Sequence, residues 1–351
     1  MMLRLQIRLR RRKRSRGGYE IDMCNGSIMD KLISFSLPLM LSGILQLMFN
    51  AVDIVVVGRF SGSQALAAVG STSALINMFT NLFIGVSLGA NVLAARFYAS
   101  GRSKEMSETV HTSITFALIS GIVMVFVGLF FSRFALELMA TPPDVINQAA
   151  LYMKIYFLGM PFFMLYNYGA AILRAVGDTK RPLFFLIAAG LINAGLNMVL
   201  VIVFHLGVAG VAIATVISQL VSCVLVLRCL YQSDSSYQLR FSKLTLKKNH
   251  LKQIFQVGIP AGIQSTVINF SNVLLQSSVN SFGSIAMAGY TAANNIFGFL
   301  FVAVNSVTQA CMSFTSQNFG VGKWKRMDKV LWNCIILSVV VAVLLGGGAY
   351  V

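Results

Sequence analysis

One carboxylate lies inside a long run of apolar residues. Of the 11 acidic residues in the chain, only Asp53 is set within such a run, residues 44–58. An ionised carboxylate at the centre of a membrane span costs about 2.5 to 3.5 kcal/mol, so it normally faces a polar cavity. Gln46 and Asn50 share a helix face with it, at spacings of four and three. The pattern indicates a cation site on a wet helix face. The alternative is that Asp53 lies near the outer end of its span, close to water, without a function.

Other apolar runs carry polar residues at helical spacing. Asn193 and Asn197 are four apart, and Thr215 lies in the next run. Any single amide could simply form an interhelical hydrogen bond, typically worth about 0.6 kcal/mol. Gathered around one carboxylate, however, amide and hydroxyl oxygens are hard ligands that suit Na⁺, and the same carboxylate could carry a proton. The residues that we expect to line a substrate cavity are Gln46, Asn50, Asn77, Asn81, Asn272 and Gln276.

The composition excludes a soluble domain. Hydrophobic residues make up 56% of the chain, charged residues 11%, and the mean hydropathy is +0.76. Soluble domains usually have about 25% charged residues. The apolar runs are about 20 residues long, which predicts helical spans rather than the shorter strands of a membrane barrel. The basic start is followed by a polar gap and a full-length span, so we expect no cleavable signal peptide. These features predict an all-α, polytopic integral membrane protein.

The net charge of +17 would suit nucleic acid, and so would the run RLRRRKRSR at residues 8–16. We favour a juxtamembrane segment on anionic lipid, worth about 1 kcal/mol per basic residue, and expect no nucleic-acid partner. The five cysteines include no CxxC pair and the three histidines lie far apart. We therefore expect neither a disulfide framework nor a structural metal, and no cofactor beyond a coupling ion.

Hydropathy predicts nine spans, three of which contain a proline that should kink them (Pro38, Pro161 and Pro260). Basic residues concentrate in the loops after spans two, four, six and eight. By the positive-inside rule, we expect a multi-pass plasma-membrane protein, in a bacterial cell an inner-membrane one, with a cytoplasmic amino terminus. The spans run over residues 33–57, 66–95, 111–131, 145–173, 183–204, 208–230, 254–279, 286–314 and 330–350.

The chain also resembles itself at a fixed offset. Segments near Pro38, Ala65 and Ala95 match segments near Pro260, Ala286 and Ser316, at offsets of 222, 221 and 221 residues. Six spans separate equivalent points, so the copies enter the membrane from the same side and form parallel repeats. The second copy stops after three spans, and we expect a natural form with about three more helices. The predicted domains are a basic cytoplasmic segment (1–31), a six-helix lobe (32–232), a cytoplasmic linker (233–251) and an incomplete second lobe (252–351).

Several of these motifs together resemble the bacterial multidrug and toxic compound extrusion (MATE) transporters. They are Pro38, DIVVVGRF from Asp53, LAAVG from Leu66, RAVGDTKRP from Arg174, and NAGLN with GVAGVAIAT between Asn193 and Thr215. The resemblance covers residues from about 27 to 351. It implies a family with twelve helices in two lobes that form a V. It also implies secondary active antiport by alternating access, with organic cations and drugs exported in exchange for Na⁺ or H⁺.

The resemblance also implies a site. Its cation-coupling residues would be Asp53, as the coupling carboxylate, with Asn193, Asn197 and Thr215. Some relatives have a second carboxylate where Asn197 stands, and others an acidic residue in span seven, where this sequence has Asn269. That pattern favours the first lobe and leaves the coupling ion open. We expect small organic cations and the lipid bilayer as partners, and a monomer.

Three other functions are weighed against this interpretation. A lipid-linked oligosaccharide flippase of the same superfamily should have a basic cavity for pyrophosphate, whereas the polar residues within these spans are amides and one acid. A membrane enzyme for prenyl or phosphoryl transfer would need paired carboxylates for Mg²⁺, which the spans lack. A passive channel would differ in lacking saturable, gradient-dependent flux.

Overall fold

A computed structural model describes residues 19–139, 141–280 and 284–350, which form a helical bundle. Residues 1–18 of the predicted basic segment and the side chain of Gln276 lie outside the described residues. The helices are α2 (Met29–Phe60), α3 (Ser63–Ala99), α4 (Ser103–Leu138), α5 (Ile146–Leu158), α6 (Met160–Ala175), α7 (Lys180–Asn197), the π-helical turn η1 (Met198–Val203), α8 (Gly207–Tyr231), the 3₁₀ turn η2 (Phe241–Lys243), α9 (Lys248–Asn280), α10 (Ser284–Gly320) and α11 (Trp324–Tyr350).

Each predicted span is helical in the structure, although span four is divided between α5 and α6 and span five between α7 and η1; the polytopic helical bundle is confirmed. Among the described residues, seven helices are long and apolar enough to cross a membrane, and the bent pair α5 and α6 makes an eighth if it forms one span. The bend, 47°, lies at Gly159 and precedes Pro161. Pro38 and Pro260 instead lie inside the continuous helices α2 and α9. The seventh predicted span, α9, has 33 residues but is less apolar, because glutamine and asparagine interrupt it.

The first helix group, α2 to α8, surrounds one large core. α4 packs on α6, α7 on α8, and α3 on both α5 and α6. Tyr168 of α6 and Phe157 of α5 are fully buried in this core. The side chains of α4 that face away from it are apolar and exposed, including Ile119, Val123 and Phe126, as expected of a surface in contact with lipid.

The second helix group, α9 to α11, packs on α2 and α3 in a reciprocal way. α10 contacts α2, and α9 contacts α3. The first helix of each predicted repeat therefore packs on the second helix of the other repeat: α2 packs on α10, and α9 packs on α3. At the centre, the Ser313 hydroxyl donates to Asn91 Oδ1 at 3.0 Å, and these residues are 222 positions apart. That separation is within one residue of the repeat offset, so corresponding points of the two copies meet there.

Glycines bring α3 and α9 into direct backbone contact. A Cβ atom placed on Gly85 would lie 2.3 Å from Gly262 Cα, and one on Gly89 would lie 2.1 Å from the Ile254 carbonyl oxygen. The spacing GxxxG therefore permits close packing, as small residues do in membrane helix pairs.

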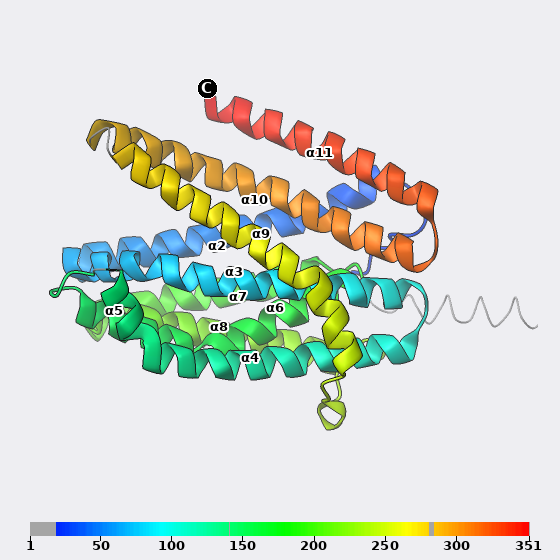
Figure 1. The fold of residues 1–351 in the computed structure, drawn as a ribbon, viewed down its shortest axis with the longest axis horizontal. Helices are drawn as coiled ribbons and strands as arrows, with labels where there is room; N and C mark the ends of the chain where they lie inside the picture. The colour runs from blue at the N-terminus through cyan, green and yellow to red at the C-terminus, as the bar shows by residue number, and fades with distance from the viewer. Residues whose placement is uncertain (1–18, 140, 281–283, 351) are drawn as a thin grey trace, which may run out of the picture.

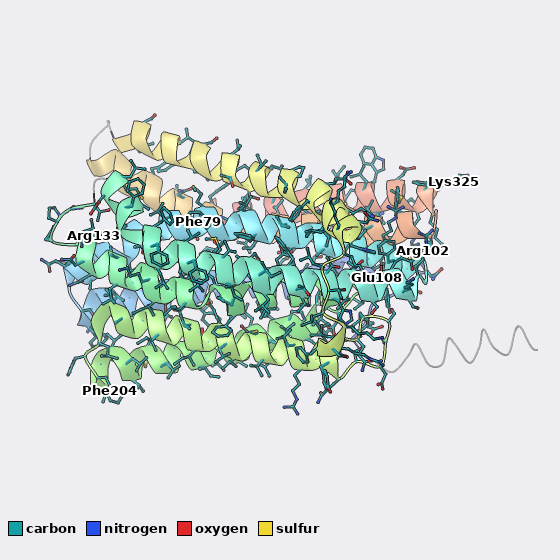
Figure 2. All side chains as sticks on the ribbon, turned by 60° about the horizontal axis from the view of Figure 1, so that its bottom comes forward. Phe79, Arg102, Glu108, Arg133, Phe204 and Lys325 are labelled. Carbon is teal, nitrogen blue, oxygen red and sulfur yellow. The ribbon has the colours of Figure 1, made fainter. Side chains whose placement is uncertain are left out.

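The two ends of the bundle differ. One end, here called the linker end, holds residues 19–28, the 232–247 connection and the turns at 100–102 and 321–323. Arg102, Glu108 and Lys325 lie there, whereas Arg133 and Phe204 mark the opposite end, here called the far end (Figure 2). At the far end, the close of α9 and the start of α10 stand away from α2 and α3 (Figure 1). The two helix groups thus diverge from the linker end.

Candidate cation site

Asp53 is buried in the first helix group. It lies two turns before the end of α2, and its side chain is only 9% exposed, so it is not in bulk solvent. α2 approaches α7 closely at this level, because Gly190 leaves room for the ring of Phe49. Gly190 therefore allows the carboxyl of Asp53 to reach α7.

Three of the predicted site residues meet Asp53 in one hydrogen-bonded chain. Asn197 Nδ2 donates to Asp53 Oδ1 and also to Asn193 Oδ1 at 3.2 Å. Asn193 Nδ2 lies 3.4 Å from Thr215 Oγ1, which in turn donates to the Val211 carbonyl at 3.0 Å. Thr215 also lies close enough to the Asp53 carboxyl to interact with it. Side chains from α2, α7 and α8 thus converge on one point.

A change of helical geometry adjoins this cluster. α7 ends at Asn197, and the next six residues form the π-helical turn η1. π-helical turns are rare, and they occur frequently at functional sites because they change the direction in which neighbouring side chains point. The Asn197 amide therefore sits at the junction of two helical geometries.

The charge of Asp53 has no counter-charge in an ion pair among the described residues, since no lysine, arginine or histidine of that part of the chain pairs with it. Asn197 Oδ1 is buried and receives no hydrogen bond from the part of the chain that the structure describes. An isolated buried carboxylate is strongly disfavoured unless a proton or a cation neutralises it. The orphaned amide oxygen beside it is a further ligand that a cation could use, so these residues fit Na⁺ as well as H⁺.

Two tyrosines that we did not predict lie beside the cluster. Tyr152 and Tyr156 of α5 are close enough to interact electrostatically with Asp53, and Gln219 of α8 adjoins Tyr156. Tyr152 and Tyr156 are four apart, as are Thr215 and Gln219. The same spacing that identified the asparagines could have identified them. Two tyrosine side chains therefore lie near the carboxylate.

The residues predicted to line a substrate cavity lie apart from this buried chain. Gln46 and Asn50 of α2 and Asn77 of α3 are exposed, Asn81 is half-buried, and Asn272 of α9 is exposed. They share no described hydrogen bond with Asp53. The α2 face that we expected to be wet is therefore exposed at Gln46 and Asn50 and buried at Asp53.

The linker end is tied together by a second set of polar contacts, made by residues 20–26, here called the N-terminal strap. On the first helix group, Glu20 accepts hydrogen bonds from the hydroxyls of Tyr98 at 2.8 Å and Tyr237 at 2.6 Å. On the second, Lys323 Nζ donates to the Cys24 carbonyl at 2.7 Å, and Arg326 Nη2 donates to the Asn25 carbonyl at 3.1 Å. The strap therefore bridges the two helix groups.

Long apolar helices with a carboxylate and amides clustered inside them define a polytopic membrane protein with a polar site within its first helix group. Comparison with known proteins identifies the family. The MatE family profile matches residues 38–199 and 260–347, and the chain belongs to this family. The protein is therefore a membrane transporter and not an enzyme.

Similar proteins and structures agree with that assignment. The chain is 31% identical over 314 residues to the probable multidrug resistance protein YoeA of Bacillus subtilis (strain 168), covering 87% of this chain and 67% of the relative. It is 24% identical to the multidrug export protein MepA of Staphylococcus aureus (strain NCTC 8325 / PS 47), covering 89% and 69%. An outward-facing structure of a multidrug resistance MATE family transporter of the MOP superfamily has a TM-score of 0.85 at 21% identity, covering 91% and 71%. At that identity, the likeness shows the fold.

Proposed function

We propose that the protein is a secondary active antiporter that exports organic cations and drugs in exchange for Na⁺ or H⁺, with Asp53 as the coupling carboxylate. The relatives' names support multidrug export. The observation that carries the proposal is the burial of Asp53, which has no ion-pair partner among the described residues, beside the Asn197 amide oxygen, which receives no hydrogen bond from them. In this site, Asn193, Asn197 and Thr215 hold the ion or orient the carboxylate.

The coupling rule follows from charge. Asp53 stabilises either the coupling ion or the state that holds the organic cation, because one carboxylate balances one positive charge. Entry of an ion neutralises Asp53 and weakens the hydrogen bond from Asn197, since a neutral acceptor forms a weaker bond than a charged one. α2 is then free to shift relative to α7, and the cavity loses affinity for the drug.

Alternating access requires that the two helix groups separate at the linker end when they close at the far end. In the structure, the strap and the glycine contacts hold the linker end closed. The basic residues gathered there make it the cytoplasmic end by the positive-inside rule. In this proposal, the structure represents a state open to the outside.

The energetics limit what voltage can do. One elementary charge that moves inward across about 100 mV yields about 2.3 kcal/mol, enough for roughly fifty-fold accumulation of a neutral drug. If a singly charged organic cation is exchanged for one ion, no net charge moves and the voltage contributes nothing. Export must then depend on the chemical gradient of the ion.

Ethidium efflux from energised cells tests the proposal, with the gene expressed in its full reading frame. The variant Asp53→Asn keeps the size of the side chain and one acceptor oxygen, but it cannot bind or release a proton or hold a charge. We expect it to insert at wild-type levels and to lose gradient-driven efflux. Collapse of the Na⁺ and pH gradients one at a time in wild-type cells identifies the ion.

Asp144→Asn is the matched control. Asp144 is exposed in the connection before α5. Its substitution removes the same charge from the chain without changing the site. Asp144→Asn should retain efflux. Full efflux by Asp53→Asn would refute the coupling role. Efflux by the wild type that survives collapse of both gradients would refute antiport itself.

A further inference from the structure

A polar pocket at the linker end lies outside the candidate cation site. Its volume is about 380 Å³, and its walls come from the start of α4 and from the connection between α8 and α9. α4 contributes Lys104, Ser107 and Glu108, and the connection contributes Lys243 and Lys247. Segments separated by more than a hundred residues therefore build one pocket.

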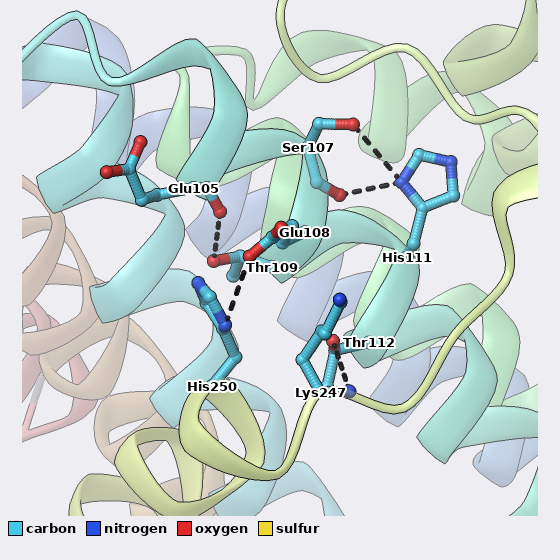
Figure 3. A network of polar contacts seen from close by, with 8 residues as sticks. All are labelled: Glu105, Ser107, Glu108, Thr109, His111, Thr112, Lys247 and His250. Atoms are coloured by element: carbon cyan, nitrogen blue, oxygen red, sulfur yellow. Dashed lines mark hydrogen bonds and ion pairs between the residues drawn. The ribbon is translucent and has the colours of Figure 1, made fainter.

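Two backbone hydrogen bonds hold the connection against α4, and Figure 3 shows the one donated by Lys247. His111 Nδ1 donates to the Ser107 carbonyl at 2.6 Å, so its Nε2 is free to accept the Arg240 N–H at 3.1 Å. At the next residue of α4 after His111, the Lys247 N–H donates to Thr112 Oγ1 at 3.2 Å. His111 is buried, so the position of the connection is fixed by a buried side chain and not by surface contacts alone.

The pocket carries excess positive charge. Among the described residues, none of Lys104, Lys243 and Lys247 forms an ion pair with a carboxylate. The acidic residue of the pocket, Glu108, instead faces His250, with Oε2 3.8 Å from His250 Nδ1. The first turn of α4 adds the positive end of a 36-residue helix. Three lysine side chains that line one pocket repel one another, and an anion bound among them would remove that cost.

The surroundings distinguish a lipid from a soluble anion. Leu118 and Ile122 lie seven and eleven residues beyond His111, on the same face of α4, and both are exposed apolar side chains. Leu118 is about 10 Å from His111 along the helix, which exceeds the thickness of one headgroup layer, about 5 to 8 Å, so a lipid whose headgroup lies beside His111 has its acyl chains beside Leu118. On the connection, Phe241 and Leu246 are also exposed, with 55% and 43% of their surface accessible.

We propose that this pocket binds the phosphate of an anionic phospholipid of the cytoplasmic leaflet, with Lys104, Lys243 and Lys247 around the phosphate and Ser107 as a hydroxyl donor. The acyl chains follow the exposed apolar face of α4, and Phe241 and Leu246 insert at headgroup level. The bound lipid thereby holds the connection between the two helix groups against α4. This proposal concerns membrane recognition, so it stands whether or not Asp53 couples transport.

Native mass spectrometry of the purified protein measures this binding, with dioleoylphosphatidylglycerol as the anionic probe and dioleoylphosphatidylcholine as the neutral one. We expect the wild type to hold one phosphatidylglycerol more tightly than any phosphatidylcholine. The triple variant Lys104→Gln, Lys243→Gln, Lys247→Gln should bind that lipid on the order of 100-fold more weakly, because each lysine near the lipid contributes about a factor of five.

The matched control is Lys252→Gln, Lys325→Gln, Lys329→Gln. These lysines are exposed at the same end but do not line the pocket. Their substitution removes the same total charge as the pocket variant. The control should bind phosphatidylglycerol as the wild type does. Equal loss in both triple variants would show a general charge effect and overturn the site, as would unchanged binding in the pocket variant. Displacement of the lipid by millimolar inorganic phosphate would overturn the lipid in favour of a soluble anion.

Discussion

Replacing Gly89 by alanine tests whether the contact between α3 and α9 belongs to one conformation of the transporter. The new methyl group would lie 2.1 Å from the Ile254 carbonyl oxygen and 3.0 Å from Gly258 N, both backbone atoms that cannot rotate away. The helices must therefore separate by about 1 Å at this crossing. Overpacking of this kind costs about 1 to 3 kcal/mol.

If the contact exists only while the linker end is closed, that cost shifts the equilibrium towards the state with an open linker end. By the relation of about 1.4 kcal/mol per factor of ten, the population of the open state should rise roughly 5-fold to 150-fold. A cysteine at position 313 reports the change, because Ser313 is buried between α3 and α10 and becomes accessible only when they part. In a chain freed of its five natural cysteines, the rate of maleimide labelling of Ser313→Cys should rise by that factor.

Gly70→Ala is the control in the same helix. A Cβ atom on Gly70 meets no atom within 4 Å, and alanine favours a helix over glycine by about 1 kcal/mol. Gly70→Ala should leave the labelling rate unchanged. Equal labelling of the Gly89→Ala and parent proteins would refute the assignment of this contact to one state.

Two further predictions concern the linker end. The double variant Lys323→Met, Arg326→Met removes donors to the strap. It should raise the labelling rate of Ser313→Cys about five-fold, since exposed charged contacts are worth about 1 kcal/mol. The control is Lys325→Met, Lys329→Met, and equal labelling rates in the two double variants would refute the role of the strap. Burial, opposed by the backbone N–H and guanidinium of Arg181, raises the pKa of the Asp178 carboxyl above 3.8. A raised carboxyl pKa means that the folded state binds the proton more tightly, so Asp178 should stabilise the fold at pH values below 3.8 and lose that contribution as the pH rises through the folded-state pKa. The melting temperature of the wild type minus that of Asp178→Asn should therefore fall as the pH rises through that range. A difference that stays constant with pH would contradict the prediction.

The spans and the cluster around Asp53 could be predicted because their signals are long or periodic. A span needs about 20 apolar residues, which hydropathy detects directly. Asn193 and Asn197 share a helix face through their spacing of four, and the structure places both beside Asp53. α9 also followed from hydropathy, although its amides leave it weaker than its neighbours.

The strap and the π-helical turn could not be predicted in this way. Lys323 and Arg326 donate to the backbone carbonyls of Cys24 and Asn25. Every residue offers a carbonyl, so the acceptor sequence carries no signal for such contacts. The turn η1 is formed by MVLVIV, a run of apolar residues with no glycine or proline. Its hydropathy suits any helix, so the local sequence does not distinguish a π-helical turn from an α-helix here.

α2 is the element through which the cation site and the linker end can influence each other. Towards the far end it packs on the first helix group, where Asp53 accepts the hydrogen bond from Asn197. Towards the linker end it packs on the second group, where Phe35 meets Phe314 edge to face at 5.6 Å and Gly43 adjoins Val302. The helix is continuous between these contacts. If Asp53 binds the coupling ion as proposed, loss of its bond to Asn197 frees one half of α2, and the other half transmits the shift to α10. A variant that weakens the Phe35 contact, such as Phe35→Leu, should therefore reduce the effect of the coupling ion on the maleimide labelling rate of Ser313→Cys. It should not alter the affinity for the ion in the state with an open linker end.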